Sequence, residues 1–110
     1  MSIRLSKRPS RVKLKGRAEA VCPISKTVDE YIVEVEYVPR EHALLIEEFE
    51  RILESYRGRE ILHEEIAVDI AERIRNAVSP AYVKAVVRST YRGVEVEVSA
   101  EIGGQPAMYI

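Results

Sequence analysis

The spacing of the hydrophobic residues changes twice along this 110-residue chain. Residues 11–22 and 31–38 largely alternate apolar and polar side chains, the two-residue period of a half-buried strand. Residues 41–78 repeat apolar side chains at spacings of three and four, which predicts helices that bury one face. Residues 82–102 return to strand-like segments. This order predicts an α+β domain built as a sheet covered by helices.

Four strands and two helices are expected from these periods. Pro39 stops the second strand, and Arg92-Gly93 forms a turn of hairpin length between the last two. Gly58 and Ser79-Pro80 end the helices. The expected strands are about 11–22, 31–38, 82–91 and 94–102, and the expected helices are about 41–57 and 63–78.

The predicted architecture is therefore ββααββ, one antiparallel sheet with two helices on one face. Residues 1–110 form a single domain, and residues 103–110 are expected to be a C-terminal tail of low order. Such a sheet has two open edge strands, and a small protein can satisfy them by pairing with further copies in a ring. The sequence thus predicts a ring-shaped homo-oligomer.

Basic residues are concentrated at the start of the chain. Residues 1–17 hold seven of them and no acid, whereas the other ten basic residues are outnumbered by 18 acidic ones. Clustered cations neutralise phosphates, so this basic arm is a candidate nucleic-acid contact. A solvated tail, or an arm that pairs with an acidic neighbouring subunit, are the alternatives. The candidate residues are Arg4, Lys7, Arg8, Arg11, Lys13, Lys15 and Arg17.

Composition excludes several classes of protein. No apolar run approaches the roughly 18 residues of a membrane span, and no secretory signal is visible, so a cytoplasmic, non-membrane protein is expected. One cysteine cannot form an internal disulfide, which leaves Cys22 as a packed side chain or a reactive thiol. The scarcity of Asn and Gln beside many charged residues is typical of a source that grows hot.

Four residues could form one chemical site. Cys22 ends the first strand, Asp29 stands at the far end of the following loop, and His63-Glu64 opens the second helix, where free N–H groups give positive potential. Each also has a structural interpretation. Cys22 could be a core side chain and Asp29 a turn residue, while His63 could cap the helix and Glu64 could be an acid that compensates the helix dipole.

The segment CPISKTVD resembles the Cys-Pro-x-x-x-x-x-Asp motif of the QueF family, the nitrile reductases of queuosine biosynthesis. The resemblance continues through Tyr37–Pro39, Ser55-Tyr56-Arg57 and His63-Glu64 without a gap. It covers about residues 22–80, and it implies a tunnel-fold unit, which is also ββααββ.

The resemblance implies a role for each candidate residue. Cys22 corresponds to the nucleophile that forms a thioimide with the nitrile of 7-cyano-7-deazaguanine, and Asp29 to the proton-transfer residue. Glu64 corresponds to the acid that binds the guanine-like edge of the base, where a carboxylate accepts paired N–H donors. His63 corresponds to a histidine of the substrate site.

The chain departs from the reductases at their NADPH motif. Where the family has a Glu and two Lys, this chain has Leu45, Glu47 and Glu50, so an acidic helix would repel a phosphorylated cofactor. The chain is similar in this respect to the short QueF-like archaeosine synthases of archaea. That likeness implies an amidinotransferase without a cofactor, which adds ammonia to a 7-cyano-7-deazaguanine base in tRNA and leaves a formamidine. A pentameric ring, or a pair of rings, is the implied assembly.

Three rival functions stay open at this point. The first is an NADPH-dependent reductase of the free base, and the second is a non-catalytic RNA-binding module in which Cys22 only packs. The third is a metal-dependent cyclohydrolase of the same fold, for which Cys22, His42 and His63 form a weak zinc set. We therefore expect no metal.

Overall fold

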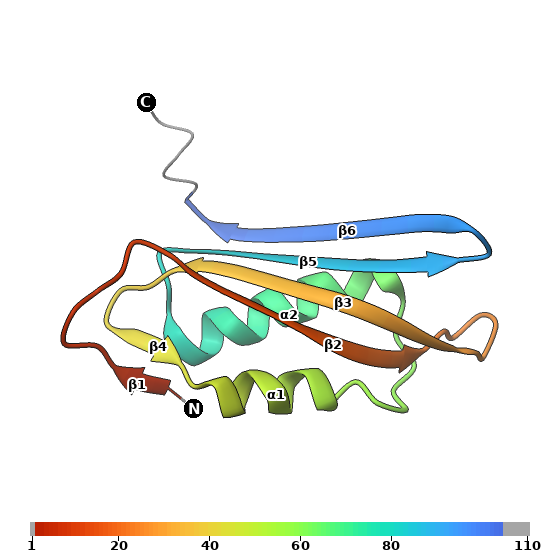
Figure 1. Cartoon of the computed structure of the whole chain (residues 1–110), viewed down its shortest axis with the longest axis horizontal. Helices are drawn as coiled ribbons and strands as arrows, with labels where there is room; N and C mark the ends of the chain where they lie inside the picture. Colours follow the sequence, from red (N-terminus) through yellow and green to blue (C-terminus); the bar gives the residue numbers. More distant parts are fainter. Residues whose placement is uncertain (1, 105–110) are drawn as a thin grey trace.

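The computed structural model describes residues 2–104 and contains a four-stranded antiparallel sheet with two helices on one of its faces (Figure 1). The order of strands in this sheet is β2-β3-β5-β6. The predicted α+β class and helix-covered sheet are confirmed. The elements are β1 (Ser2–Arg4), β2 (Val12–Val21), β3 (Val28–Val38), β4 (His42–Leu44), α1 (Ile46–Glu54), α2 (His63–Val78), β5 (Tyr82–Tyr91) and β6 (Val94–Gly103).

Side-chain alternation in the strands separates a helix-covered face from an open, charged face. One row of the covered face crosses all four strands through Leu14, Val35, Ala85 and Ala100, which are paired neighbours in the register. Val35 and Ala85 are fully buried. Because the side-chain period of a strand is two, this register sends every intervening polar residue to the open face.

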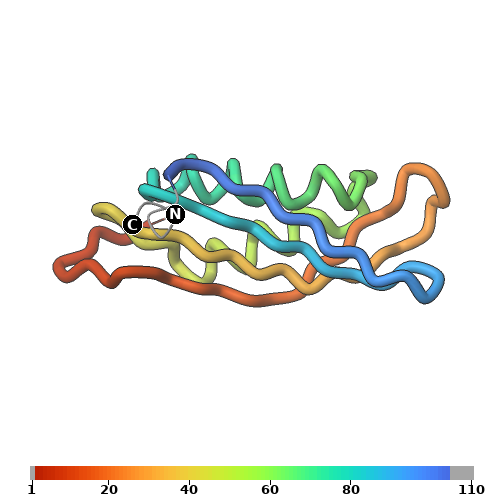
Figure 2. The backbone as a smooth tube through the Cα atoms, turned by 90° about the horizontal axis from the view of Figure 1, so that it is seen from above, coloured from red at the N-terminus to blue at the C-terminus, as the bar shows by residue number. Residues whose placement is uncertain are grey.

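The two helices cover the apolar face side by side (Figure 2). The apolar side of α2 buries Ile66, Ile70 and Ile74 completely and packs against β5 and β6, while α1 lies against β2. Contact between α1 and β2 is close at Gly16, where an added Cβ would stand 2.6 Å from Leu53 Cδ1. This two-layer slab measures 45 × 32 × 17 Å.

The structure adds a small sheet that the sequence did not predict. Strand β1 pairs with β4 at three positions, Ser2 with Leu44 through Arg4 with His42. Because β4 takes up residues 42–44, helix α1 begins at Ile46 instead of about residue 41, and it ends at Glu54 before a turn. Strand β3 also starts earlier than expected, at Val28, opposite Val21.

The basic residues of the first 17 positions are divided among three segments. Arg4 belongs to β1, Lys7, Arg8 and Arg11 lie between the strands, and Lys13, Lys15 and Arg17 belong to β2. Gly103 of the expected tail is the last residue of β6, and residues 105–110 lie outside the described residues. Within residues 2–104, no helix is both long and apolar enough to cross a membrane.

Candidate active site

Four segments of the chain meet at one end of the sheet. The N–H of Val21 donates to the carbonyl oxygen of Arg59 at 2.9 Å, and the carbonyl oxygen of Val21 accepts from the N–H of Ile61 at 3.1 Å. These bonds hold the end of β2 against the segment that enters α2. The loop after β2, the end of β5 and the start of α2 share this end of the molecule (Figure 1).

Residues 22–27 form the tight loop between β2 and β3. The N–H of Cys22 donates to the carbonyl oxygen of Thr27 at 2.9 Å, and the N–H of Lys26 donates to the carbonyl oxygen of Cys22 at 2.8 Å. Lys26 has φ 63°, a left-handed conformation that is strained for a residue with a Cβ. Its ammonium pairs with Glu60 at 2.9 Å, which fastens the loop to the segment before α2.

The loop favours the thiolate form of Cys22. A hydrogen bond from the hydroxyl of Ser25, followed by backbone N–H groups of Ser25 and Ile24, lowers the pKa of the Cys22 thiol, while burial and the charge of Asp29 act in the opposite direction. Donors aimed at a sulfur stabilise its anion, and the anion is the nucleophile. Cys22 is partly exposed and is the chain's single cysteine.

Asp29 and His63 form a direct pair at the start of β3 and α2. His63 Nε2 lies 3.1 Å from Asp29 Oδ2, and the two side chains are only 15% and 10% exposed. The hydroxyl of Tyr31 donates to the same Asp29 oxygen at 3.5 Å, and the Tyr31 ring packs edge-on to the imidazole. Burial and the neighbouring charge of Asp29 raise the pKa of Tyr31, so the phenol keeps its proton.

The other imidazole nitrogen has a partner that the sequence did not indicate. His63 Nδ1 lies 3.3 Å from the hydroxyl oxygen of Ser89, near the end of β5. Tyr31 was also missed as a site residue. Both side chains are on the face of the sheet that the helices cover. Ile32, which follows Tyr31, pairs with Arg88, which precedes Ser89. Only the register of β3 against β5 places Tyr31 and Ser89 together, and no motif spacing reveals it.

Glu64 lies one residue further along α2 and is exposed. Its side chain makes no hydrogen bond or ion pair with the other residues of the range 2–104. Its charge nevertheless acts on Tyr31, as do those of Asp29 and Cys22. The four predicted residues Cys22, Asp29, His63 and Glu64 are therefore in one electrostatic neighbourhood around Tyr31, and a carboxylate is available there for a ligand.

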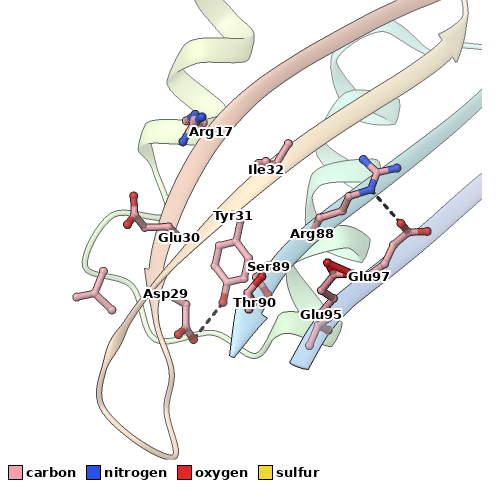
Figure 3. A pocket seen from close by; sticks show the side chains of 12 residues that line it. Arg17, Asp29, Glu30, Tyr31, Ile32, Arg88, Ser89, Thr90, Glu95 and Glu97 are labelled. Atoms are coloured by element: carbon pink, nitrogen blue, oxygen red, sulfur yellow. Dashed lines mark hydrogen bonds and ion pairs between the residues drawn. The ribbon is translucent and has the colours of Figure 1, made fainter. Parts of the chain in front are cut away.

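A hollow adjoins this cluster at the same end of the sheet (Figure 3). Its volume is about 910 Å³, and Asp29, Tyr31 and Ser89 line it together with Arg88 and Glu97. Cys22, His63 and Glu64 are not part of its lining. The hollow thus adjoins the cluster at Asp29, Tyr31 and Ser89.

The predicted nucleic-acid contacts differ in how far their charge is already neutralised. Arg4, Arg11 and Lys13 form ion pairs with carboxylates, of Glu41 at 3.1 Å, Glu36 at 2.7 Å and Glu34 at 3.2 Å respectively. Within the described part of the chain, Lys7, Arg8, Lys15 and Arg17 are exposed and make no ion pair.

The surface of α1 is acidic, as the sequence indicated. Leu45 is its N-cap residue, while Glu47 and Glu50 are exposed on the helix. Among the described residues, no three His, Cys, Asp or Glu side chains gather in a way that could hold a metal ion.

Comparison with known proteins supports the resemblance seen in the sequence. The model of the family described as QueF-like protein matches residues 29–106. The archaeosine synthase of Pyrobaculum calidifontis is 61% identical over 108 residues, which cover 98% of this chain and 99% of that protein. An NADPH-dependent 7-cyano-7-deazaguanine reductase of an Anaeromyxobacter species is 28% identical over 79% of this chain and 72% of its own.

A solved structure agrees with this assignment. The crystal structure of the archaeosine synthase QueF-Like in the apo form superposes with a TM-score of 0.88 and 63% identity, and the match covers 91% of this chain and all of that one. The high identity holds over nearly the whole length of both chains, so the likeness extends well beyond the candidate site. The chain belongs to the QueF-like protein family.

Proposed function

We propose that this protein is an archaeosine synthase, an enzyme that converts the nitrile of a 7-cyano-7-deazaguanine base in tRNA to a formamidine. The observation that carries the proposal is a loop-activated thiol beside a hydrogen-bonded Asp29–His63 pair, in a chain 61% identical to the archaeosine synthase of Pyrobaculum calidifontis. The identity supports the substrate, and the geometry supports the chemistry.

In the first step, the Cys22 thiolate attacks the nitrile carbon. Asp29 first takes the proton of the thiol. A carbon–sulfur bond then forms, one π-electron pair of the nitrile moves to the nitrogen, and Asp29 passes the proton on to that nitrogen. The product is a thioimide. Asp29 is suited to this transfer because its charge acts on the Cys22 thiol and its carboxylate already shares hydrogen bonds with His63 and Tyr31.

In the second step, ammonia adds to the thioimide carbon, and the π-electron pair moves to the imide nitrogen. A proton returns to Asp29 as the tetrahedral intermediate forms. The carbon–sulfur bond then breaks with its electron pair on sulfur, which regenerates the Cys22 thiolate and releases the amidine. Nitrile and ammonia together account for every atom of the product, so the reaction needs neither a reductant nor a cofactor.

Glu64 is proposed to bind the guanine-like edge of the base. A carboxylate can accept two parallel N–H donors, and such charge-assisted bonds are the strong ones. Glu64 is exposed, and its side chain makes no hydrogen bond or ion pair within the described residues. His63, in the adjacent position, is proposed to act on the same substrate through Asp29.

The runner-up function is an NADPH-dependent reductase of the free base. The acidic surface of α1, where Glu47 and Glu50 are exposed, favours the transferase because it would repel the phosphates of NADPH. Consumption of NADPH on adding 7-cyano-7-deazaguanine would support the reductase instead.

We propose that Lys7, Arg8, Lys15 and Arg17 supply most of the affinity for tRNA that the seven basic residues contribute. Their charges are exposed and unpaired within residues 2–104. Arg4, Arg11 and Lys13 would first have to leave their carboxylate partners. A tRNA substrate also implies a cytoplasmic protein.

A ring-shaped homo-oligomer is proposed as the assembly, as a pentamer or a pair of pentamers. Strands β2 and β6 are the two open edges of the sheet, and their side chains on the open face are largely basic in β2 and acidic in β6. An edge of one sign can pair with the opposite edge of the next copy, which closes a ring. A monomer in native mass spectrometry would contradict this.

Intact mass measurement tests the chemistry. After mixing with free 7-cyano-7-deazaguanine, the protein should gain the mass of the base, with or without NADPH, and the Cys22→Ala variant should not. On tRNA that carries the nitrile base, ammonium should yield the formamidine with wild type but not with folded Cys22→Ala. Formamidine formation by Cys22→Ala at the wild-type rate would contradict the role of the thiol, and no formamidine from either protein would favour a role in RNA binding alone.

Salt dependence tests the RNA contacts. Replacing Lys7, Arg8, Lys15 and Arg17 by Gln should flatten the plot of log affinity against log salt, since each lost phosphate contact removes about 0.7 to 0.9 from its slope. The matched control replaces Arg4, Arg11 and Lys13 by Gln, which should change the slope less. A larger change in the control would contradict the assignment.

A further inference from the structure

The imidazole of His63 is held at both of its nitrogens. Nε2 faces Asp29 Oδ2 at 3.1 Å, from β3, and Nδ1 faces the Ser89 hydroxyl at 3.3 Å, from β5. The two contacts come from neighbouring strands, and the ring spans the gap between them. Ser89 lies 26 residues beyond His63 in the chain.

Protonation is constrained by this arrangement. An ionised carboxylate only accepts hydrogen bonds, so the contact with Asp29 requires a proton on Nε2. In the neutral ring Nδ1 then carries a lone pair, and the Ser89 O–H must donate to it. A hydroxyl both donates and accepts, so Ser89 can also receive a bond from Nδ1–H when the ring takes a second proton. Ser89 is thus a suitable partner for both charge states.

Packing fixes the plane of the ring as well. The Tyr31 ring meets the imidazole edge-on, with 5.2 Å between centroids and 89° between planes. The His63 side chain is 15% exposed. Asp29 is hydrogen-bonded to one nitrogen, and Tyr31 packs against the ring. Among the described residues, the second nitrogen is fixed only by its hydrogen bond with Ser89.

We propose that Ser89 is a positioning residue, which keeps the His63 imidazole in the Nε2–H form against Asp29. This role rests on the proposed function, because it matters for catalysis only if Asp29 moves the proton between the thiol and the nitrile nitrogen. Ser89 itself touches neither Cys22 nor the reacting atoms in this scheme. It acts through the ring.

Imidazole ¹⁵N NMR of the whole protein tests the proposal without any reaction. The chain has two histidines, and His42 in β4 serves as the internal reference. In Ser89→Ala, the Nδ1 resonance of His63 should move downfield, as expected of a lone pair that has lost its donor. Ser89→Thr keeps the hydroxyl on a residue that strands favour, so the wild-type resonance should return. An unchanged His63 spectrum in Ser89→Ala would overturn the proposal.

Kinetics on nitrile-bearing tRNA tests the consequence. Ser89→Ala should lower kcat by about tenfold, a part of the hundredfold or more that general acid–base catalysis supplies, with KM changed by less than about twofold. Ser89→Thr should recover kcat. Ser10→Ala, which removes an exposed hydroxyl between β1 and β2, is the matched control and should behave as wild type. An unaltered kcat in Ser89→Ala would overturn the positioning role.

The two hypotheses fail in different experiments. If wild type forms no covalent adduct and no amidine, the proposed function fails, while the ¹⁵N spectra still decide whether Ser89 holds the ring. If the adduct forms and Ser89→Ala matches wild type in both spectrum and kcat, only the inference about Ser89 fails.

Discussion

Val21 and Glu60 form a parallel bridge, in which both backbone groups of Val21 are bonded to the residues on either side of Glu60. The bridge joins the last residue of β2 to the segment that enters α2. It therefore sets the distance between Cys22, which follows β2, and His63, which begins α2. The ion pair of Lys26 with Glu60 reinforces it from the loop.

Lys26 should prefer replacement by Gly over replacement by Ala. Both substitutions remove the ion pair with Glu60, but only Gly adopts the φ of 63° without strain. The Gly variant should be more stable to urea than the Ala variant by about 1 kcal/mol. Equal stabilities would show that the left-handed conformation of Lys26 does not persist in solution.

Ser25→Ala should make the Cys22 thiol less acidic. The Ser25 hydroxyl is the largest cause that lowers the pKa of Cys22, so its removal should raise that pKa. A smaller fraction of thiolate at neutral pH follows, and the pH profile of alkylation by iodoacetamide should move to higher pH. Ser10→Ala, outside the loop, is the control. A profile that stays in place, or moves to lower pH, would contradict the role of Ser25.

Gly103→Ala should destabilise the fold more than Gly93→Ala. Both glycines have positive φ, 93° and 80°, so both substitutions introduce backbone strain. Only at Gly103 would the new Cβ also collide with backbone, 2.5 Å from the carbonyl oxygen of Ala81. The difference in the free energy of unfolding should be about 2 kcal/mol. Similar losses would mean that Ala81 moves away at little cost.

Tyr56→Phe should weaken the connection between the turn after α1 and helix α2. The Tyr56 hydroxyl donates to Asp69 at 2.6 Å from a fully buried ring, on which the guanidinium groups of Arg59 and Arg73 lie. A hydrogen bond to a charged acceptor is worth about 1.5–3 kcal/mol, so the variant should lose about 2 kcal/mol in chemical denaturation. A loss below about 0.5 kcal/mol would assign the stabilising role to the ring alone.

The sequence predicted the long elements well because their apolar residues repeat many times. Helix α2 lies over residues 63–78 as expected, and the turn at Arg92-Gly93 has positive φ at both residues. Strands β1 and β4 were missed because each has three residues, too few for an alternation to be recognised. Only their mutual pairing makes them strands.

The candidate site was predicted in part, for a similar physical reason. Cys22, Asp29, His63 and Glu64 belong to segments whose motif is visible in the chain. Tyr31 and Ser89 belong to the site through strand register and packing, which join residues far apart in sequence. A tyrosine or serine on the covered side of a strand looks like an ordinary core residue until its neighbour across the sheet is known.

The meeting of four chain segments at one end of the sheet has a consequence for how activity appears during folding. Ser89 can reach His63 only after β5 has docked on β3, and this pairing closes a long loop and is expected late. A chain that has formed only the β2–β3 hairpin already holds Cys22 and Asp29 together. Its His63 imidazole is not yet fixed by Ser89. In a refolding reaction, thiol reactivity should therefore appear before turnover.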